Sequence, residues 1–435
     1  MSNMDTLKNN SFVLHGDICF SGSRESLITM AGGYLICEEG VSKGVYASLP
    51  EQYENLPLIG HEGKLILPGL VDLHMHAPQF SFRSLGMDCE LLEWLEAYAF
   101  PEEAKYSDLE YARTAYGMLV RHLAQGPNSR VCLFATLHVP ATMLLMDLLE
   151  ESGLAGMVGK VNMDRNCSRI LCEDSAGHSR EATFNWLAAS AERYKNVKPI
   201  ITPRFIPACS DELMDMLAGL QKEFKTPVQS HLSESLAEVE WVRQLCPSCK
   251  TYADAYMDHG LFGGGVPTIM AHCVWPDDRE MELLKNRDVY VAHCPQSNMN
   301  LISGIAPVRR YINNDINVGL GSDVAGGCHT SIFRAMAEAI QVSKLRSRYV
   351  DRNDPPLTVK EVFYLGTAGG GSFFGKVGSF ESGYELDAII IDDSDILPPF
   401  PLTIEERLTR VIYLSDNNRV FEKYVRGQKI ISPAD

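Results

Sequence analysis

The chain has 435 residues, of which 45% are hydrophobic and 22% are charged, a composition typical of globular rather than disordered proteins. Its formal net charge of −17 disfavours binding to nucleic acid or to an anionic membrane surface. The longest nearly apolar run, residues 131–146, is shorter than the roughly 20 residues of a membrane span, so we expect no membrane association.

The expected compartment follows from the first residues and from the cysteines. Residues 1–10 lack the apolar core of a secretory signal peptide. The 12 cysteines are scattered along a chain that is not small, which argues against a disulfide framework. We therefore expect a reduced, cytoplasmic protein.

Short alternating segments at the two ends of the chain, separated by Gly, Asp and Asn turns, predict β-strands. These segments are residues 12–19, 27–37, 388–391 and 410–414. We expect residues 1–68 and 381–435 to pair into one small, discontinuous β-sandwich domain. Residues 79–128 have a mostly helical pattern and are placed to cover the mouth of the larger domain.

Between these ends, short apolar runs that end in polar residues alternate with amphipathic stretches. The runs have the length and composition of buried parallel strands and comprise residues 65–73, 131–137, 156–163, 199–203, 227–230, 267–271, 289–292 and 316–322. The clearest helical stretches are residues 141–151, 181–194, 211–224, 277–286 and 331–344.

This alternation predicts βαβ units and an α/β fold with a parallel sheet. Eight predicted strands are the number in a (β/α)8 barrel of the TIM type, which we expect over residues 69–380. Functional side chains of such a barrel lie at the carboxyl ends of the strands. An open, doubly wound parallel sheet is the alternative fold that is also consistent with this alternation.

Several predicted strand ends carry residues that bind metals. His74 and His76 follow the first run, and residues i and i+2 of a strand face the same side, so both can reach one ion. Other strand ends supply His231, His272 and Asp323. Such nitrogen and oxygen donors suit zinc, with iron or manganese as alternatives, and a bound ion would activate water near neutral pH. The competing interpretation is that these histidines are packed core residues.

Glu234 lies three residues after His231, close to the predicted metal. A carboxylate in that position can take a proton from water and pass it to a substrate. A glutamate at the start of a helix, favoured there by the helix dipole, is the alternative, and the residues alone leave both open.

Two other kinds of zinc site find no support in the residues. Zinc deaminases of the cytidine type carry an H-x-E segment, which this chain lacks. Cys246 and Cys249 form a lone CxxC without the second pair that a zinc ribbon needs.

Three segments resemble motifs of the amidohydrolase superfamily. They are PGLVDLHMH at residues 68–76, HCPQSN at 293–298 and GLGSD at 319–323. The resemblance covers nearly the whole chain and implies a (β/α)8 barrel with a single catalytic metal. Within the superfamily, HAPQFSF at 76–82, ITPRF at 201–205 and HLSE at 231–234 resemble the guanine deaminases. Pro78, residues 83–86 and the region after Ile206 depart from that pattern.

Carried over position by position, the resemblance implies metal ligands at His74, His76, His231 and Asp323. It implies that Glu234 shuttles protons, that Asp323 is a second proton acceptor and that His272 contacts the reacting water or its product. The residues that would hold the purine are Gln79, Arg204 and Phe205, together with His272.

The implied reaction is the hydrolysis of guanine to xanthine and ammonia. A metal-activated hydroxide would attack C2 while Glu234 protonates N3. The resemblance further implies one Zn²⁺ per chain, with Fe²⁺ as the alternative, and a homodimer. Another purine, a pterin or a triazine is the alternative substrate, and a non-catalytic binding protein on the same fold is the alternative of a different class.

Overall fold

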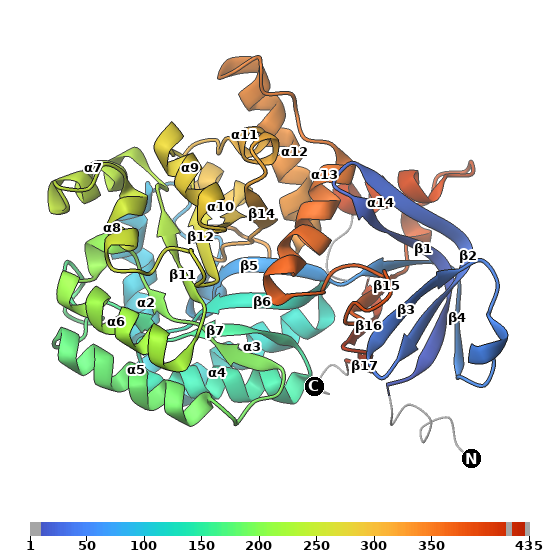
Figure 1. The fold of residues 1–435 in the computed structure, drawn as a ribbon, viewed down its shortest axis with the longest axis horizontal. Helices are drawn as coiled ribbons and strands as arrows, with labels where there is room; N and C mark the ends of the chain where they lie inside the picture. Colours follow the sequence, from blue (N-terminus) through green and yellow to red (C-terminus); the bar gives the residue numbers. More distant parts are fainter. Residues whose placement is uncertain (1–9, 415–419, 431–435) are drawn as a thin grey trace.

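The computed structural model describes residues 10–414 and 420–430, so most of the segment used for the signal-peptide expectation lies outside the described residues (Figure 1). The fold is mixed α/β. One sheet is formed from both ends of the chain, and beside it lie parallel strands with helices around them (Figure 1). No helix within the described ranges is long and apolar enough to cross a membrane.

The first sheet has seven strands, in the order β17-β16-β15-β4-β1-β2-β3. Their bounds are β1 Phe12–Ser23, β2 Ser26–Glu38, β3 Val41–Tyr46, β4 Leu58–Pro68, β15 Ala388–Ile391, β16 Val420–Val425 and β17 Gln428–Lys429. The sheet curls, because Val41 at the start of the edge strand β3 forms a bridge with Glu385, just before β15. The expected β unit from both ends is thus one continuous curled sheet, not two separately bonded sheets.

Residues 410–414 are not a strand, and that prediction was wrong. They end helix α14 (Ile404–Leu414), which packs on β1 and β2. Its buried side chains Leu408, Val411 and Ile412 recur at the spacing of one helix face. Five residues are too few to distinguish this period from the alternation of a strand.

The parallel strands form two four-stranded sheets, β5-β6-β7-β9 and β11-β12-β13-β14, and a pair of strands, β8 and β10. Their bounds are β5 Leu70–His76, β6 Asn128–Phe134, β7 Ala155–Gly159, β8 Val161–Asn162, β9 Val197–Pro199, β10 Thr202–Pro203, β11 Val228–Leu232, β12 Thr268–His272, β13 Tyr290–His293 and β14 Asn317–Leu320. A bridge from Ile201 to Val228 connects the first group of strands to the second.

Three predicted strands are each divided in two by the structure. Residues 65–73 divide at Gly69 between β4 and β5, where a Cβ would clash with the side chain of Ser129. Residues 156–163 divide at Lys160, and residues 199–203 divide between β9 and β10. Pro199 has no N–H to continue the ladder, and the chain changes its pairing partner after it.

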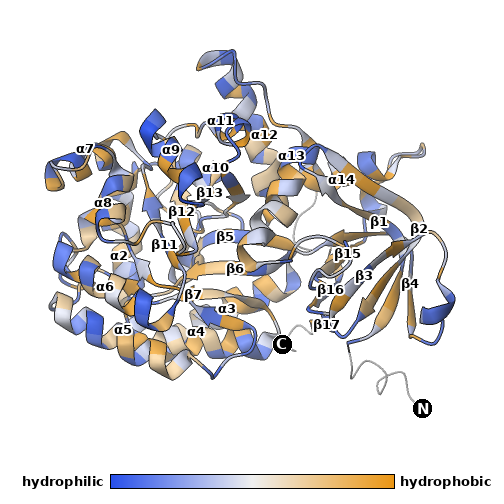
Figure 2. Cartoon of the chain, in the orientation of Figure 1, coloured by the Kyte–Doolittle hydropathy of each residue, from blue (hydrophilic) through white to orange (hydrophobic). Residues whose placement is uncertain are grey.

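Helices pack around the parallel strands, and their outward faces carry most of the hydrophilic residues (Figure 2). Their bounds are α1 Leu91–Trp94, α2 Phe100–Ala104, α3 Leu109–Gln125, α4 Val139–Ser152, α5 Ala176–Ser190, α6 Asp211–Phe224, α7 Leu236–Leu245, α8 Tyr252–Asp258, α9 Asp278–Asn286, α10 Pro295–Asn300, α11 Val308–Asn313, α12 Ile332–Tyr349 and α13 Val359–Tyr364. The segment 79–128 contains α1, α2 and α3 and is mostly helical, as predicted.

The expectation of wholly reduced cysteines was wrong at one place. Cys167 and Cys172 form a disulfide in the loop that follows β8, with their Cα atoms 5.5 Å apart. The two cysteines are five residues apart, and the loop turns back on itself and brings them together. Their spacing in the sequence gives no sign of this pairing. The other ten cysteines are free.

Candidate active site

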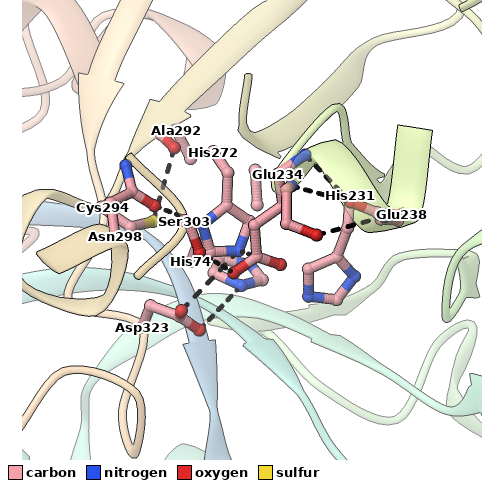
Figure 3. Close-up of polar contacts among 12 residues, drawn as sticks. His74, His231, Glu234, Glu238, His272, Ala292, Cys294, Asn298, Ser303 and Asp323 are labelled. Atoms are coloured by element: carbon pink, nitrogen blue, oxygen red, sulfur yellow. Dashed lines mark hydrogen bonds and ion pairs between the residues drawn. The ribbon is translucent and has the colours of Figure 1, made fainter. Parts of the chain in front are cut away.

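The carboxyl ends of four parallel strands bring the predicted polar residues around one point (Figure 3). His74 and His76 come from β5, His231 from β11 and His272 from the last position of β12, while Asp323 follows β14. Each of the five side chains is at most 8% exposed. The strand-end residues singled out in the sequence therefore form one buried cluster.

The side chains of this cluster face one another through potential metal-binding atoms. Asp323 Oδ1 lies 3.0 Å from His74 Nε2 and 3.5 Å from His76 Nε2. His76 Nε2 lies 3.1 Å from His231 Nε2. The Nδ1–H of His231 donates to the Arg204 carbonyl at 2.6 Å, which leaves the lone pair of that ring on Nε2, facing the centre.

The charges of the cluster also suit a cation. Burial lowers the pKa values of His74, His76 and His231, which keeps their rings neutral. Burial alone would raise the pKa of Asp323, but the adjacent His74 and His272 outweigh it and hold that pKa below its usual value. The ligand atoms of His74, His76 and Asp323 lie close enough together to hold one ion, as do those of His74, His231 and His272. Neutral imidazoles and a carboxylate of this kind fit a divalent metal.

Cys294 lies near His272 and Asp323 but is a poor candidate ligand. Burial raises the pKa of its thiol well above the usual value, and its Sγ lies 3.4 Å from the Ala292 carbonyl. Because the thiolate is the form that binds metals, the histidines and Asp323 are better candidate ligands than Cys294.

Glu234 lies at the edge of this cluster, in the loop between β11 and α7. Its Oε2 is 3.4 Å from His272 Nε2, and its Oε1 accepts a hydrogen bond from Ser303 Oγ at 3.2 Å (Figure 3). Burial, together with Glu238 and Asp323, raises the pKa of Glu234 to about 8, although His272 acts in the opposite direction. A carboxyl group with a pKa near neutrality is suited to exchange protons.

The backbone around Glu234 is fixed by the start of α7. Ser235 and Glu238 form a capping box, and Glu238 Oε2 also accepts the Glu234 N–H at 2.9 Å. Sequence reasoning did not assign Glu238, although the Ser-x-x-Glu spacing before an apolar stretch is a readable signal. The hydroxyl of Tyr252 donates a hydrogen bond to the other carboxylate oxygen of Glu238 at 2.8 Å, so the Glu238 side chain is itself held in place.

His272 is oriented by Asn298, which sequence reasoning also left without a role. A hydrogen bond of 2.9 Å connects His272 Nδ1 to Asn298 Oδ1. Burial opposes the charged ring, but the carboxylates of Glu234 and Asp323 outweigh it and raise the pKa of His272. Asn298 lies within the HCPQSN motif, and its position there was the one available signal.

Several site residues have positive φ angles that L-residues seldom adopt. The φ values are 48° at Ser233, 71° at His272 and 47° at Asp323. Such backbone strain is typical of functional sites, where the surrounding structure over-determines the conformation.

The three residues predicted to hold the purine lie beside this cluster. Gln79 comes from the 3-10 turn Ala77–Phe82 after β5, and Arg204 and Phe205 follow β10. All three line one cavity with His231 and Glu234. The predicted substrate-binding and catalytic residues are therefore brought together.

Glu103, from α2 in the segment 79–128, was not anticipated by the sequence. Its carboxylate accepts hydrogen bonds from both Gln79 and Arg204, and it is 1% exposed. No signal in the sequence pointed to it, because its contact with Arg204 joins residues 101 positions apart and no motif marks it. Leu95 and Trp94, from the same segment, also line the cavity.

Comparisons with known proteins agree with this geometry. Residues 65–430 match the Amidohydrolase family. Guanine deaminase of Dictyostelium discoideum is 37% identical over 387 residues, covering 87% of this chain and 85% of that protein. Guanine deaminase of Homo sapiens is 35% identical over 381 residues, covering 85% of this chain and 83% of that protein.

Solved structures resemble the whole chain. The crystal structure of guanine deaminase from C. acetobutylicum with bound guanine in the active site has a TM-score of 0.94 and 43% identity, and covers 97% of this chain and 100% of that one. The E. coli guanine deaminase has a TM-score of 0.88 at 27% identity, covering 97% of this chain and 100% of that one. The chain therefore belongs to the amidohydrolase family and, within it, to the group of the guanine deaminases.

Proposed function

We propose that the protein catalyses the hydrolytic deamination of guanine to xanthine and ammonia. The observation that carries the proposal is the single cavity that joins a buried His and Asp cluster to Gln79, Arg204 and Phe205. The similarity to a structure that holds guanine supports the substrate.

The metal would be held by His74, His76, His231 and Asp323, since His74, His76 and Asp323 form one group of close ligand atoms and His231 Nε2 lies 3.1 Å from His76 Nε2. We infer one Zn²⁺ per chain, because neutral imidazoles and a carboxylate suit zinc, with Fe²⁺ as the alternative. When bound, the ion supplies a nucleophile by lowering the pKa of water to near neutrality.

Glu234 would take a proton from the reacting water and deliver it to N3 of the purine, which makes C2 more electrophilic. Asp323 would accept the second proton and His272 would hold the reacting oxygen. The second oxygen of Asp323 lies 3.7 Å from His272 Nε2, so both groups face the same small volume. Transfer of that second proton from Asp323, by way of Glu234, to the exocyclic nitrogen would release ammonia.

The purine would be held on the other side of the cavity. Arg204 would donate to O6, Gln79 would bind the same edge of the ring, and Phe205 would pack on its face. Phe205 is 9% exposed and already packs among buried apolar side chains, so its ring is held in place before a ligand binds.

We infer that the parallel strands close into a (β/α)8 barrel over residues 69–380, with residues 1–68 and 381–435 as the small β domain. Two hydrogen bonds support closure between β5 and the segment after β14: Asp323 N–H to the His74 carbonyl at 2.9 Å and His76 N–H to the Val324 carbonyl at 3.0 Å. A cytoplasmic location and a homodimer are proposals that rest on composition and on the resemblance.

The test is the release of ammonia and xanthine from guanine by the purified protein, with metal analysis of the same sample. Adenine, cytosine and a triazine serve as competing substrates. We expect guanine to react fastest and activity to disappear when a chelator removes the metal. Faster turnover of another substrate, or activity that survives complete metal removal, would contradict the proposal.

A further inference from the structure

Glu103 connects the two polar side chains that we assign to the purine. Its Oε1 accepts a hydrogen bond from Gln79 Nε2 at 2.7 Å and one from Arg204 Nη2 at 2.9 Å. Its Oε2 accepts one from Arg204 Nη1 at 2.6 Å. Charge-assisted, two-point pairs of this kind are short and directional, and all three side chains are at most 2% exposed. The three groups therefore act as one rigid unit.

The orientation of the Gln79 amide is fixed at both of its ends. Nε2 donates to Glu103, and Oε1 accepts the backbone N–H of Ala325 at 3.1 Å. Turning the amide over would place oxygen against the carboxylate and nitrogen against an N–H, so neither hydrogen bond could form. Nε2 thus keeps one further N–H for a ligand.

Arg204, like Nε2 of Gln79, offers only hydrogen-bond donors to a ligand. A guanidinium has five N–H groups and no acceptor, and Glu103 engages two of them. Glu103 also balances the buried charge of Arg204, so the pair adds no net charge to the cavity. Together, Gln79 and Arg204 present N–H groups to a neutral ligand. A carbonyl oxygen matches this pattern, whereas an exocyclic amine in its place would bring donor against donor.

We propose that Glu103 is a positioning residue for substrate selection. By fixing Gln79 and Arg204 as paired donors, it makes the cavity prefer a purine with a carbonyl oxygen at C6 over one without it. Glu103 acts through its two partners and not by touching the substrate. This inference rests on the proposed function, because it takes guanine as the reference substrate.

The experiment compares Glu103→Gln with the unaltered enzyme on guanine, on 2-aminopurine, which lacks the C6 oxygen, and on 2,6-diaminopurine, which carries an amine there. A site built to hydrogen-bond a substrate group rejects analogues without it by about 10⁴–10⁵-fold. We expect the preference in kcat/KM for guanine over 2-aminopurine to fall by at least about 10-fold in Glu103→Gln. KM for guanine should rise by a larger factor than kcat falls.

Two further variants separate positioning from a general structural role. Glu103→Asp keeps the charge but is too short to reach both partners, so we expect a loss of preference of about 3-fold, smaller than that of Glu103→Gln. Glu102→Gln alters the neighbouring residue of α2, which is buried and binds Ser81 and Lys105. That control should keep the preference of the unaltered enzyme.

Equal losses on guanine and 2-aminopurine in Glu103→Gln would overturn the inference, because a structural defect lowers both by the same factor. If Glu103→Gln cannot be purified folded, an unchanged preference in Glu103→Asp would overturn it instead. A failure of the proposed function is distinguishable, since the unaltered enzyme would then release no ammonia from guanine.

Discussion

The two halves of the candidate active site are built in different ways. The metal-facing half comes from strand ends: His74 and His76 on β5, His231 on β11 and Asp323 after β14. The recognition half combines a turn, a helix of the segment 79–128 and the residues after β10. The first half depends on strand register, which is set by backbone hydrogen bonds between neighbouring strands, whereas the second depends on side-chain hydrogen bonds from Gln79 and Arg204 to Glu103.

This difference has a chemical consequence. In the metal-facing half, neutral rings and a carboxylate direct their potential ligand atoms toward one another, an arrangement that suits a cation. In the recognition half, Glu103 already balances the charge of Arg204 and fixes the Gln79 amide. We therefore expect changes in the first half to affect metal content and changes in the second half to affect mainly substrate binding, with the metal retained.

The largest expected effect is that of His231→Ala. Loss of this ligand should abolish metal binding and lower ammonia release by more than about 10⁴-fold, the most that a single acid–base group contributes. Metal content by atomic spectroscopy and the rate on guanine are measured on the same sample. His259→Ala is the control, because His259 pairs with Asp215 away from the site. Metal content equal to that of the unaltered protein would remove His231 from the ligand set.

Glu234→Gln should have the next largest effect and leave the metal in place. The amide cannot take or deliver a proton, so kcat should fall by about 10²–10⁴-fold. The measurement is kcat on guanine alongside metal content. Glu240→Gln, on the exposed side of α7, is the matched control. Near-normal turnover by Glu234→Gln would show that another group shuttles the proton.

The same division explains what could be predicted from the sequence. The metal-facing residues were predictable because each follows an apolar run, and the ends of parallel strands meet at one edge. His-x-His spacing added that His74 and His76 face the same side. Glu103 could not be predicted, because α2 is a five-residue helix whose position is set by tertiary packing and not by its own pattern.

Errors in the predicted elements have similar causes. The pattern of residues 410–414 predicts a strand because a short apolar segment does not reveal its period, whereas burial on β1 and β2 selects the helix. The runs 156–163 and 199–203 look continuous, but Lys160 and Pro199 mark changes of pairing partner that depend on neighbouring strands. The roles of Asn298 and Glu238 also depend on their partners, His272 and Glu234.

Phe205→Ala tests the recognition half and should have a smaller effect than either change above. Losing one stacked ring costs about 1–3 kcal/mol of binding, so kcat/KM for guanine should fall by about 5–150-fold, mostly through KM. Metal content should not change, and steady-state kinetics with metal analysis measures both. Phe184→Ala, on α5, is the control for loss of an aromatic side chain. Metal loss in Phe205→Ala would show that the two halves are not separable.

The smallest effect concerns the loop that both halves share. Residues 324–329 follow Asp323 and supply the Ala325 N–H to Gln79. Gln296 holds this loop by accepting the Cys328 N–H at 2.6 Å, and it donates to Glu338 Oε1 on α12 at 2.6 Å. Burial raises the pKa of Glu338 to about 7, against the weaker opposing effects of Arg334, 4.0 Å away, and of Gln296.

Because the folded pKa of Glu338 is raised, the unfolded chain releases this proton first as the pH increases. The free energy of unfolding should therefore fall between the ordinary carboxyl pKa, about 4.5, and about 7. Glu338→Gln keeps the acceptor for Gln296 but cannot ionise, so it should be more stable than the unaltered protein by about 1–2 kcal/mol at pH 8 and nearly equal to it at pH 4.5. Denaturant unfolding at the two pH values measures this, with the exposed Glu282→Gln as control. If the two proteins differ in stability by the same amount at both pH values, Glu338 does not titrate in this range. Ionisation of Glu338 would then not destabilise the folded loop, and the prediction would be wrong.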